Sequence, residues 1–163
     1  MENYIVINGK RTDLTSEQLK ELGIVVNENL FKRIKDSKYY FINDLSEVRC
    51  DHDTQRAVDA VRYDLANYCR DKEIMNQRAL HEFLSRLLWR YSMTHDGDKI
   101  DWSNDDTIKY KIYYDYNTKQ FYVYDNQHHQ IEGTIYFYSY DIAESAIKEI
   151  IEPFMKGNPD FVW

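Results

Sequence analysis

Glycine, proline and cysteine are scarce in this chain. Its 163 residues include 5 Gly, 2 Pro and 2 Cys. Few glycines and prolines leave few obligatory turns, so the sequence predicts regular secondary structure. Two cysteines, Cys50 and Cys69, are too few for a disulfide scaffold, which is typical of proteins in a reducing cytoplasm.

The sequence also lacks long apolar runs and an excess of basic residues. No run approaches the roughly 18 apolar residues of a membrane-spanning helix, and residues 1–11 do not follow the pattern of a secretory signal. With 21 Lys and Arg against 28 Asp and Glu, the net charge is −7. General nucleic-acid binding needs a basic face. We therefore expect neither membrane insertion nor general nucleic-acid binding.

Known catalytic motifs are missing as well. The sequence has no phosphate-binding glycine loop, no His-Glu-x-x-His, no nucleophile elbow and no kinase signature. We therefore predict a protein that is not an enzyme and holds no cofactor.

The first 50 residues predict two hairpins and a short helix. Residues 4–7 form a β-branched run, and Asn8-Gly9 is a common two-residue hairpin turn. Thr15 and Gln18 have the spacing of a capping box, which indicates a helix start. Residues 39–42 and 47–50 predict a second antiparallel pair around an Asn43-Asp44 turn.

Residues 51–70 are ambiguous, since their apolar positions fit either a helix or an extended segment. Asp71 then predicts the start of a long helix over about 71–94. One continuous apolar stripe is expected to be its buried side, and Trp89 lies off that stripe. The stripe consists of Ile74, Leu80, Phe83, Leu84, Leu87, Leu88 and Tyr91.

The second half alternates apolar and polar residues in three segments, at 110–115, 121–124 and 135–138. Ser139 is the expected cap of a C-terminal helix over about 140–152, which Pro153 would end. The helix that begins near residue 71 is likewise preceded by an extended segment and a polar cap, so the order strand, cap, helix occurs twice. The predicted class is α+β with antiparallel sheets: one domain over 1–163, with sub-units 1–98 and 99–163 as the finer division, built from two ββ(β)α units.

Alternation in the last three strands predicts a sheet face rich in tyrosine, opposite the helix-covered face. It would carry Lys111, Tyr113, Tyr122, Tyr124, Tyr136 and Tyr138. Tyrosine is enriched at interaction hot spots, so one interpretation is a partner surface. The alternative is that the first half of the chain covers this face.

Two other clusters carry possible ligands for metal ions. Cys50-Asp51-His52-Asp53 concentrates ligand types but lacks a second ligand pair, so a polar strand end is the main alternative. The stretch from Asp96 to Asp101 superficially resembles a calcium loop, but it lacks the closing Glu, and a solvated turn is the simpler interpretation. No metal site is predicted.

Arginine, tryptophan and acidic clusters give further alternatives. Arg86, Trp89 and Arg90, with Lys111, suit phosphates and bases, although Glu82 lies four residues before Arg86 and offers it an ion pair. Residues 71–163 hold 10 basic and 16 acidic side chains, a net charge of −6. Acids that include Asp101, Asp105 and Asp106 either imitate phosphates to a basic partner or form a soluble surface.

Several short motifs together resemble uncharacterised phage and prophage accessory proteins of Firmicutes. They are the segments 4–10, 14–19, 39–42, 99–104, 135–139 and 143–147. The resemblance implies a mobile-element accessory protein acting in the cytoplasm of a bacterial host, and such proteins frequently inhibit bacterial defences. It carries over no functional residue.

Three functions follow as hypotheses. In the first, the protein blocks a host defence effector, such as a CRISPR effector, as an anti-CRISPR protein does; Asp101, Asp105, Asp106 and the tyrosines would dock on its nucleic-acid channel. In the second, Arg86, Trp89, Arg90 and Lys111 sequester a nucleotide immune signal. The third is a structural or regulatory phage protein.

Overall fold

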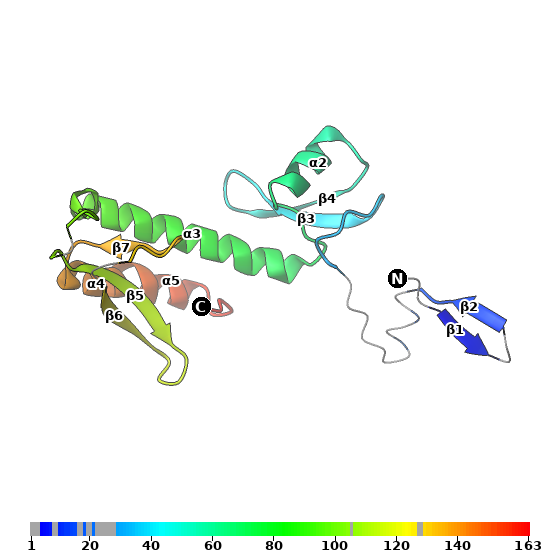
Figure 1. The fold of residues 1–163 in the computed structure, drawn as a ribbon. Coiled ribbons are helices and arrows are strands. Elements are labelled where there is room, and N and C mark those ends of the chain that lie inside the picture. Colours follow the sequence, from blue (N-terminus) through cyan, green and yellow to red (C-terminus); the bar gives the residue numbers. More distant parts are fainter. Residues whose placement is uncertain are drawn as a thin grey trace.

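A computed structural model describes residues 4–7, 10–15, 18, 21, 29–104, 106–126 and 129–163 (Figure 1). It confirms the α+β class with antiparallel strands. The N-terminal hairpin pairs β1 (Tyr4–Ile7) with β2 (Lys10–Asp13). Thr15 and Gln18 exchange the predicted capping-box hydrogen bonds, at 2.9 and 3.3 Å. The Asn8-Gly9 turn itself lies outside the described residues.

The first unit is built around the β3–β4 hairpin. Strand β3 (Lys38–Ile42) pairs antiparallel with β4 (Val48–His52), as the sequence predicted. The ambiguous stretch after β4 contains a helix, α2 (Ala57–Asp64). Cys69 then forms an isolated antiparallel bridge with Tyr40. The bridge lies on the side of β3 away from β4, so the order across the unit is β4, β3, Cys69.

The second unit repeats this arrangement. Strand β5 (Lys109–Asp115) is central, with β6 (Gln120–Asn126) on one side and the short β7 (Tyr136–Phe137) on the other. The helical cap follows two residues after the bridging residue in both units: Asp71 after Cys69, and Ser139 after Phe137. The expected pair of ββ(β)α units is therefore visible in the backbone.

A single long helix joins the two units. Helix α3 (Lys72–Thr94) begins at Asp71, whose carboxylate accepts hydrogen bonds from the backbone N–H groups of Glu73 and Ile74, as predicted. A 3₁₀ turn, η1 (Gly97–Lys99), follows it. Gly97 packs against Ser92 so closely that an added Cβ would lie 2.4 Å from the Ser92 hydroxyl. That hydroxyl donates to the carbonyl of Tyr136, which ties the end of α3 to β7.

The predicted buried stripe on α3 is confirmed for Leu80, Leu84, Leu87, Leu88 and Tyr91, which pack on the second unit's core, but it does not continue to the start of the helix. Met75 and Ala79 pack into the first unit's core, whereas Leu84, Leu88 and Tyr91 belong to the second. Leu84 lies nine positions after Met75, about two and a half turns, so the two halves of α3 bury opposite sides. Ile74 and Phe83, both expected on the stripe, are 39% and 43% exposed. Figure 1 shows the two units on opposite sides of the helix.

The C-terminal helix is longer than predicted. Ser139 caps α4 (Tyr140–Ala146), as expected, with its hydroxyl accepting from the Ile142 N–H. A π-helical segment, η2 (Ile147–Ile151), and α5 (Glu152–Gly157) continue it. Pro153 was expected to end the helix. It lies instead in the first turn of α5, just after the π segment, where its missing N–H is tolerated.

The two cores differ in composition. The second unit's core is apolar and includes Phe137, Ile151, Phe154 and Phe161. In the first unit, the buried residues include two carboxylates, Asp53 and Asp59. The finer division predicted from the sequence, between residues 1–98 and 99–163, lies just after α3. Because α3 has residues in both cores, this helix belongs to both units.

Candidate functional site

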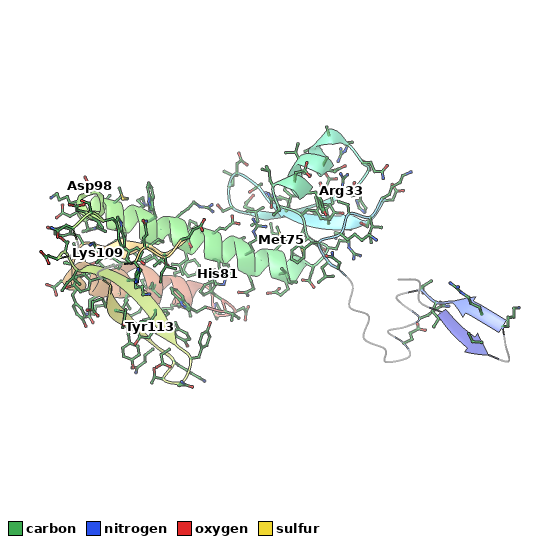
Figure 2. All side chains as sticks on the ribbon, in the orientation of Figure 1. Arg33, Met75, His81, Asp98, Lys109 and Tyr113 are labelled. Atoms are coloured by element: carbon green, nitrogen blue, oxygen red, sulfur yellow. The ribbon has the colours of Figure 1, made fainter. Side chains whose placement is uncertain are left out.

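The outer face of the β5–β6 hairpin is the candidate site. We define the tyrosine face as the residues that cross-strand pairing places there: Lys111, Tyr113, Asp115, Gln120, Tyr122 and Tyr124. The alternate residues, such as Ile112 and Val123, pack on the second unit's core. The alternation predicted from the sequence is thus the one in the structure. Figure 2 shows Tyr113 projecting from the hairpin on the side away from α3.

The three tyrosines of this face pack against one another. The rings of Tyr113 and Tyr122 are stacked, with centroids 5.5 Å apart, and Tyr124 meets Tyr113 edge-on at 6.2 Å. The Tyr122 hydroxyl donates to Gln120 at 3.0 Å. Tyr113 and Tyr124 remain 40% and 54% exposed. Because the rings support each other on a paired hairpin, they form an ordered aromatic surface in contact with solvent.

Two further tyrosines predicted for this face lie in different surroundings. Tyr136 is buried: Trp102 packs edge-on against it at 4.8 Å, and its hydroxyl donates to the His129 carbonyl. Tyr138 follows β7 and is exposed. The alternative that the first half of the chain covers this face was wrong for the described residues. Trp102 and residues 129–131, which cover Tyr136, belong to the second half.

Acidic residues lie at both ends of β5. Asp101 and Asp106, in the connection before β5, are exposed, and hydrogen bonds from Ser103 hold the pKa of Asp101 below its usual range. At the other end, Asp115 accepts from the N–H groups of Asn117 and Thr118 in the turn. Asp105, also predicted, lies outside the described residues.

Lysines on β5 are already engaged with aromatic rings. The buried Lys109 ammonium donates to the Asn104 carbonyl at 2.7 Å and lies 5.3 Å from the centre of the Trp102 ring. Lys111 lies over Tyr124 at 5.5 Å. In both contacts the ring belongs to a neighbouring segment, Trp102 before β5 and Tyr124 on β6, and its negative face attracts the lysine cation.

The residues predicted for nucleotide binding are spread over two elements. Arg86, Trp89 and Arg90 lie exposed on α3, whereas Lys111 is on the tyrosine face. The Arg86 guanidinium donates to Ser46 at 2.6 Å and lies 4.0 Å from Glu82, the ion pair that the sequence offered as the alternative. Trp89 lines a cavity of about 170 Å³ with Trp102 and Tyr136.

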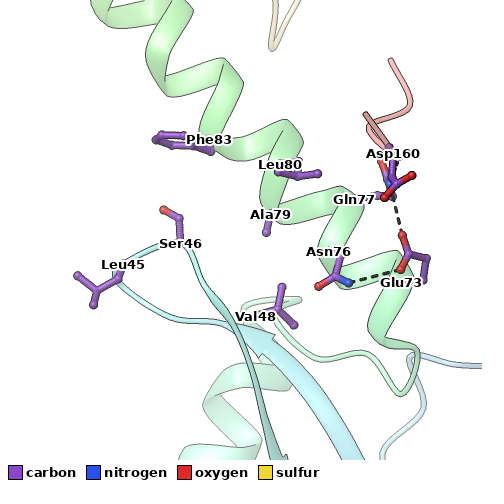
Figure 3. A pocket seen from close by; sticks show the side chains of 10 residues that line it. All are labelled: Leu45, Ser46, Val48, Glu73, Asn76, Gln77, Ala79, Leu80, Phe83 and Asp160. Carbon is purple, nitrogen blue, oxygen red and sulfur yellow. Dashed lines mark hydrogen bonds between the residues drawn. The ribbon is translucent and has the colours of Figure 1, made fainter. Parts of the chain in front are cut away.

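A larger cavity of about 460 Å³ lies along α3 (Figure 3). Leu45 and Val48 of the first unit, Leu80 and Phe83 of α3, and Asp160 are among the residues that line it. The Gln77 side chain holds the C-terminal segment there, since it donates to the Asp160 carbonyl and accepts from the Val162 N–H. The lining contains no His, Cys or Lys, so the cavity offers apolar contacts and carboxylates.

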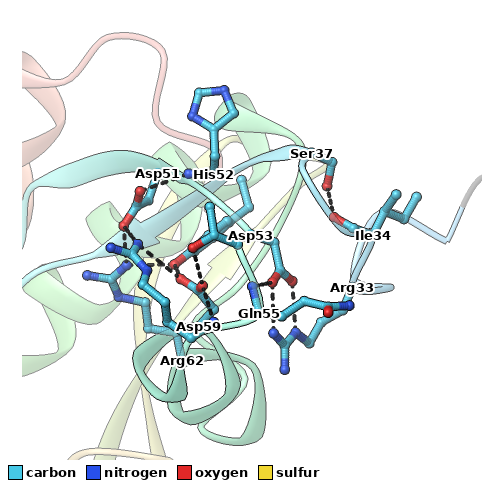
Figure 4. Close-up of polar contacts among 12 residues, drawn as sticks. Arg33, Ile34, Ser37, Asp51, His52, Asp53, Gln55, Asp59 and Arg62 are labelled. Atoms are coloured by element: carbon cyan, nitrogen blue, oxygen red, sulfur yellow. Dashed lines mark hydrogen bonds and ion pairs between the residues drawn. The ribbon is translucent and has the colours of Figure 1, made fainter.

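The Cys50–Asp53 cluster is part of an ion-pair network (Figure 4). Arg33 donates to both oxygens of Asp53, at 2.7 and 2.8 Å, and lowers the pKa of that buried carboxyl to about 2. The carboxylate of Asp51 accepts from Arg56 and Arg62. Within the described ranges, no three His, Cys, Asp or Glu side chains are grouped to hold a metal ion.

The calcium-like stretch is a short turn. Lys99 pairs with Asp96 at 2.6 Å across η1, and the side chains of this turn are largely exposed.

The sequence did not predict that a helix covers the outer face of the β3–β4 hairpin, the face that carries Tyr39, Phe41 and Asp51. Helix α2 lies on that face, and its Asp59, fully buried, accepts from the Tyr39 hydroxyl at 2.8 Å. Burial alone would raise the pKa of Asp59, but hydrogen bonds from Tyr39 and from the Arg56 backbone outweigh it, so the pKa is lowered. The α2 positions with apolar spacing, Val58 and Val61, face solvent instead.

Comparison with protein-family models, with curated proteins and with solved structures finds no match to this chain. The resemblance to phage accessory proteins therefore stays a prediction. In the described part of the chain, no helix combines the length and apolarity needed to cross a membrane.

Proposed function

We propose that this protein is a non-enzymatic inhibitor that binds a bacterial defence effector through the tyrosine face and the acidic residues near it. The observation that carries the proposal is the packed cluster of Tyr113, Tyr122 and Tyr124 on a paired hairpin, in which Tyr113 and Tyr124 are exposed. Tyrosine anchors supply large contact areas at low entropic cost, and they dominate many interfaces.

The charge around this cluster supports a basic partner. Asp101 and Asp106 precede β5, and Asp115 ends it. A basic channel that normally binds nucleic acid has the complementary charge. An effector of this class would lose its nucleic-acid site when the tyrosine face occupies it, and the complex would weaken as salt screens the charges.

A phage-plating assay tests the proposal. The chain is expressed in a bacterium that carries a defence system with a nucleic-acid-binding effector, and plating efficiency of a sensitive phage is measured. We expect plating to rise with the wild-type chain and the gain to be lost with the Tyr113→Ser, Tyr124→Ser double variant. Tyr63→Ser is the matched control, because Tyr63 is equally exposed, at 43%, but lies on α2.

The acidic contribution is tested separately. Reversing Asp101 and Asp106 to lysine should reduce protection, whereas reversing Asp141 and Glu152, which are exposed on α4 and α5, changes the net charge equally and should not. Inhibition that survives both the tyrosine and the aspartate changes would refute the proposal.

A further inference from the structure

The outer face of the first unit shows how this chain binds an arginine. Tyr39 and Phe41 of β3 and Asp51 of β4 lie on that face. The guanidinium carbon of Arg62, from α2, is 3.5 Å from the centre of the Phe41 ring. The same guanidinium donates to the Tyr39 hydroxyl at 2.6 Å and to Asp51 at 3.1 Å. The site thus consists of aromatic rings and one carboxylate on the outer face of a hairpin.

The tyrosine face contains the same chemical groups in the equivalent unit. Tyr113 and Tyr122 provide stacked rings, and Asp115 lies two residues after Tyr113 on the same face. One oxygen of Asp115, Oδ1, accepts from the turn N–H groups; no described residue is in hydrogen-bond contact with Oδ2. Among the described residues, Lys111 lies over the neighbouring Tyr124 ring, and no arginine lies over Tyr113 or Tyr122.

We propose that the tyrosine face is a binding site for an arginine presented by a helix of a partner protein. The guanidinium would stack on Tyr113 and Tyr122 and donate to the Asp115 carboxylate, as Arg62 does with Phe41 and Asp51. This inference rests on the proposed function and names the group by which the basic partner is recognised. Arginine is preferred to lysine because a planar guanidinium can stack and hydrogen-bond at the same time.

The charge of the second unit favours a protein partner over a nucleic acid. Residues 71–163 carry 10 basic and 16 acidic side chains, a net charge of −6, which repels phosphates. The Asp115 carboxylate would also repel a phosphate bound on this face, because both groups are negatively charged. A cationic side chain, in contrast, gains both a carboxylate and the negative faces of the rings.

A pair of designed peptides tests this site. Both are helices of equal charge with the same apolar neighbours around the charged positions, one with two arginines four residues apart and the other with two lysines in their place. Binding to the full chain is measured by fluorescence anisotropy, and the contact residues are mapped from tyrosine NMR signals. We expect the arginine peptide to bind at least about fivefold more tightly, because lysine cannot stack as a planar fork.

Asp115→Asn is the variant that isolates the carboxylate. Asparagine can keep the hydrogen bonds of the turn but lacks the charge. We expect it to weaken the arginine peptide about tenfold, as loss of one charge-assisted hydrogen bond would. Asp125→Asn, an exposed acid on β6 outside the tyrosine face, is the control and should bind like the wild type.

Four results would overturn the inference, three of them seen with the peptides. They are equal affinity for the two peptides, equal binding by Asp115→Asn and Asp125→Asn, and displacement of the arginine peptide by a second copy of the chain, seen as a dimer that Asp115→Asn abolishes. Tighter binding of a single-stranded oligonucleotide to the same face would also overturn it. The proposed function fails separately, if the wild-type chain prefers the arginine peptide as expected but gives no phage protection.

Discussion

The two units of this protein share a strand order and a helix cap, but they treat the outer face of the hairpin differently. In the first unit, α2 covers that face, and Tyr39 is fully buried. In the second unit, Tyr113 and Tyr124 on the corresponding face remain in contact with solvent. The difference teaches that an aromatic hairpin face in this fold becomes part of the interior when the chain supplies a cover, and stays open to solvent when it does not.

The units also differ in what they bury. The first holds Asp53 and Asp59 inside, each satisfied by arginine, tyrosine or backbone donors. The second has an aromatic and aliphatic core and, among its described residues, buries Lys109 but no carboxylate. Buried carboxylates contribute specificity at a desolvation cost, whereas apolar burial contributes most of the stability. We therefore expect the first unit to respond more to pH.

The largest expected effect separates the covered face from the open one. Tyr39→Ala should lower the free energy of unfolding by about 3–5 kcal/mol, because it removes a buried ring. Tyr124→Ala should cost less than about 1 kcal/mol, since that ring is half exposed and contributes mainly cross-strand contacts. Urea unfolding of both variants measures the difference. Equal losses would mean that the open face is covered in solution.

A somewhat smaller effect tests whether the units are separate along α3. Met75→Ala and Leu88→Ala should each cost about 3 kcal/mol, but in different cores. Hydrogen exchange read by mass spectrometry should show loss of protection in residues 38–52 for the first variant. For the second, the loss should be in residues 109–126. Loss of protection across both units in both variants would show that they unfold together. Trp89→Ala, exposed on the same helix, is the control.

The smallest effect is a pH dependence centred on the buried Asp53 of the first unit. Arg33 lowers the pKa of Asp53 from 3.8 to about 2, which corresponds to about 2 kcal/mol of stability. Because the folded pKa is the lower one, this stability is complete above pH 3.8 and is lost as the pH falls through about 2. NMR signals of β3 and β4 should therefore disappear before those of β5 and β6 on acidification.

Asp53→Asn is the control for this titration. It removes the charge at every pH, so the variant should be less stable near neutrality. It should also lack the acid step, which is the loss of stability as the pH falls through about 2. An unchanged acid step in Asp53→Asn would assign it to other carboxyls, with Asp51 and Asp59 the first to test.

Local patterns in the sequence predicted the strands and caps well. The β-branched and tyrosine-rich runs are the strands, and Asp71 and Ser139 cap the helices where their side chains suggested. These features depend on neighbours in the chain, so the sequence carries them directly. The alternation that defines the tyrosine face was predicted for the same reason.

The remaining features depend on contacts between distant residues. Apolar spacing could not show that α2 turns Val58 and Val61 outward, because its inner contact is the buried Asp59 with Tyr39, 20 positions earlier. Nor could one periodic stripe show that α3 has a separate core on each side. The role of Asp115 becomes visible only when the two hairpin faces are compared. In the first unit, the signal is a carboxylate and aromatic residues on one hairpin face, together with an arginine on the helix that follows. A carboxylate among the tyrosines of the second hairpin, without such a helix, could have indicated an arginine site there.

The connection of Arg62 to its own hairpin has a consequence for any molecule that binds the second unit. Arg62 and Phe41 belong to the same chain, with 20 residues between them. Their contact therefore costs none of the translational and rotational entropy that two separate molecules lose when they associate. A partner's arginine must meet an association cost of at least about 4 kcal/mol before any contact is felt. One guanidinium is too little to offset that cost. A partner that binds Tyr113, Tyr122 and Tyr124 must therefore bring apolar neighbours with its arginine, and a larger footprint than the eight residues of α2.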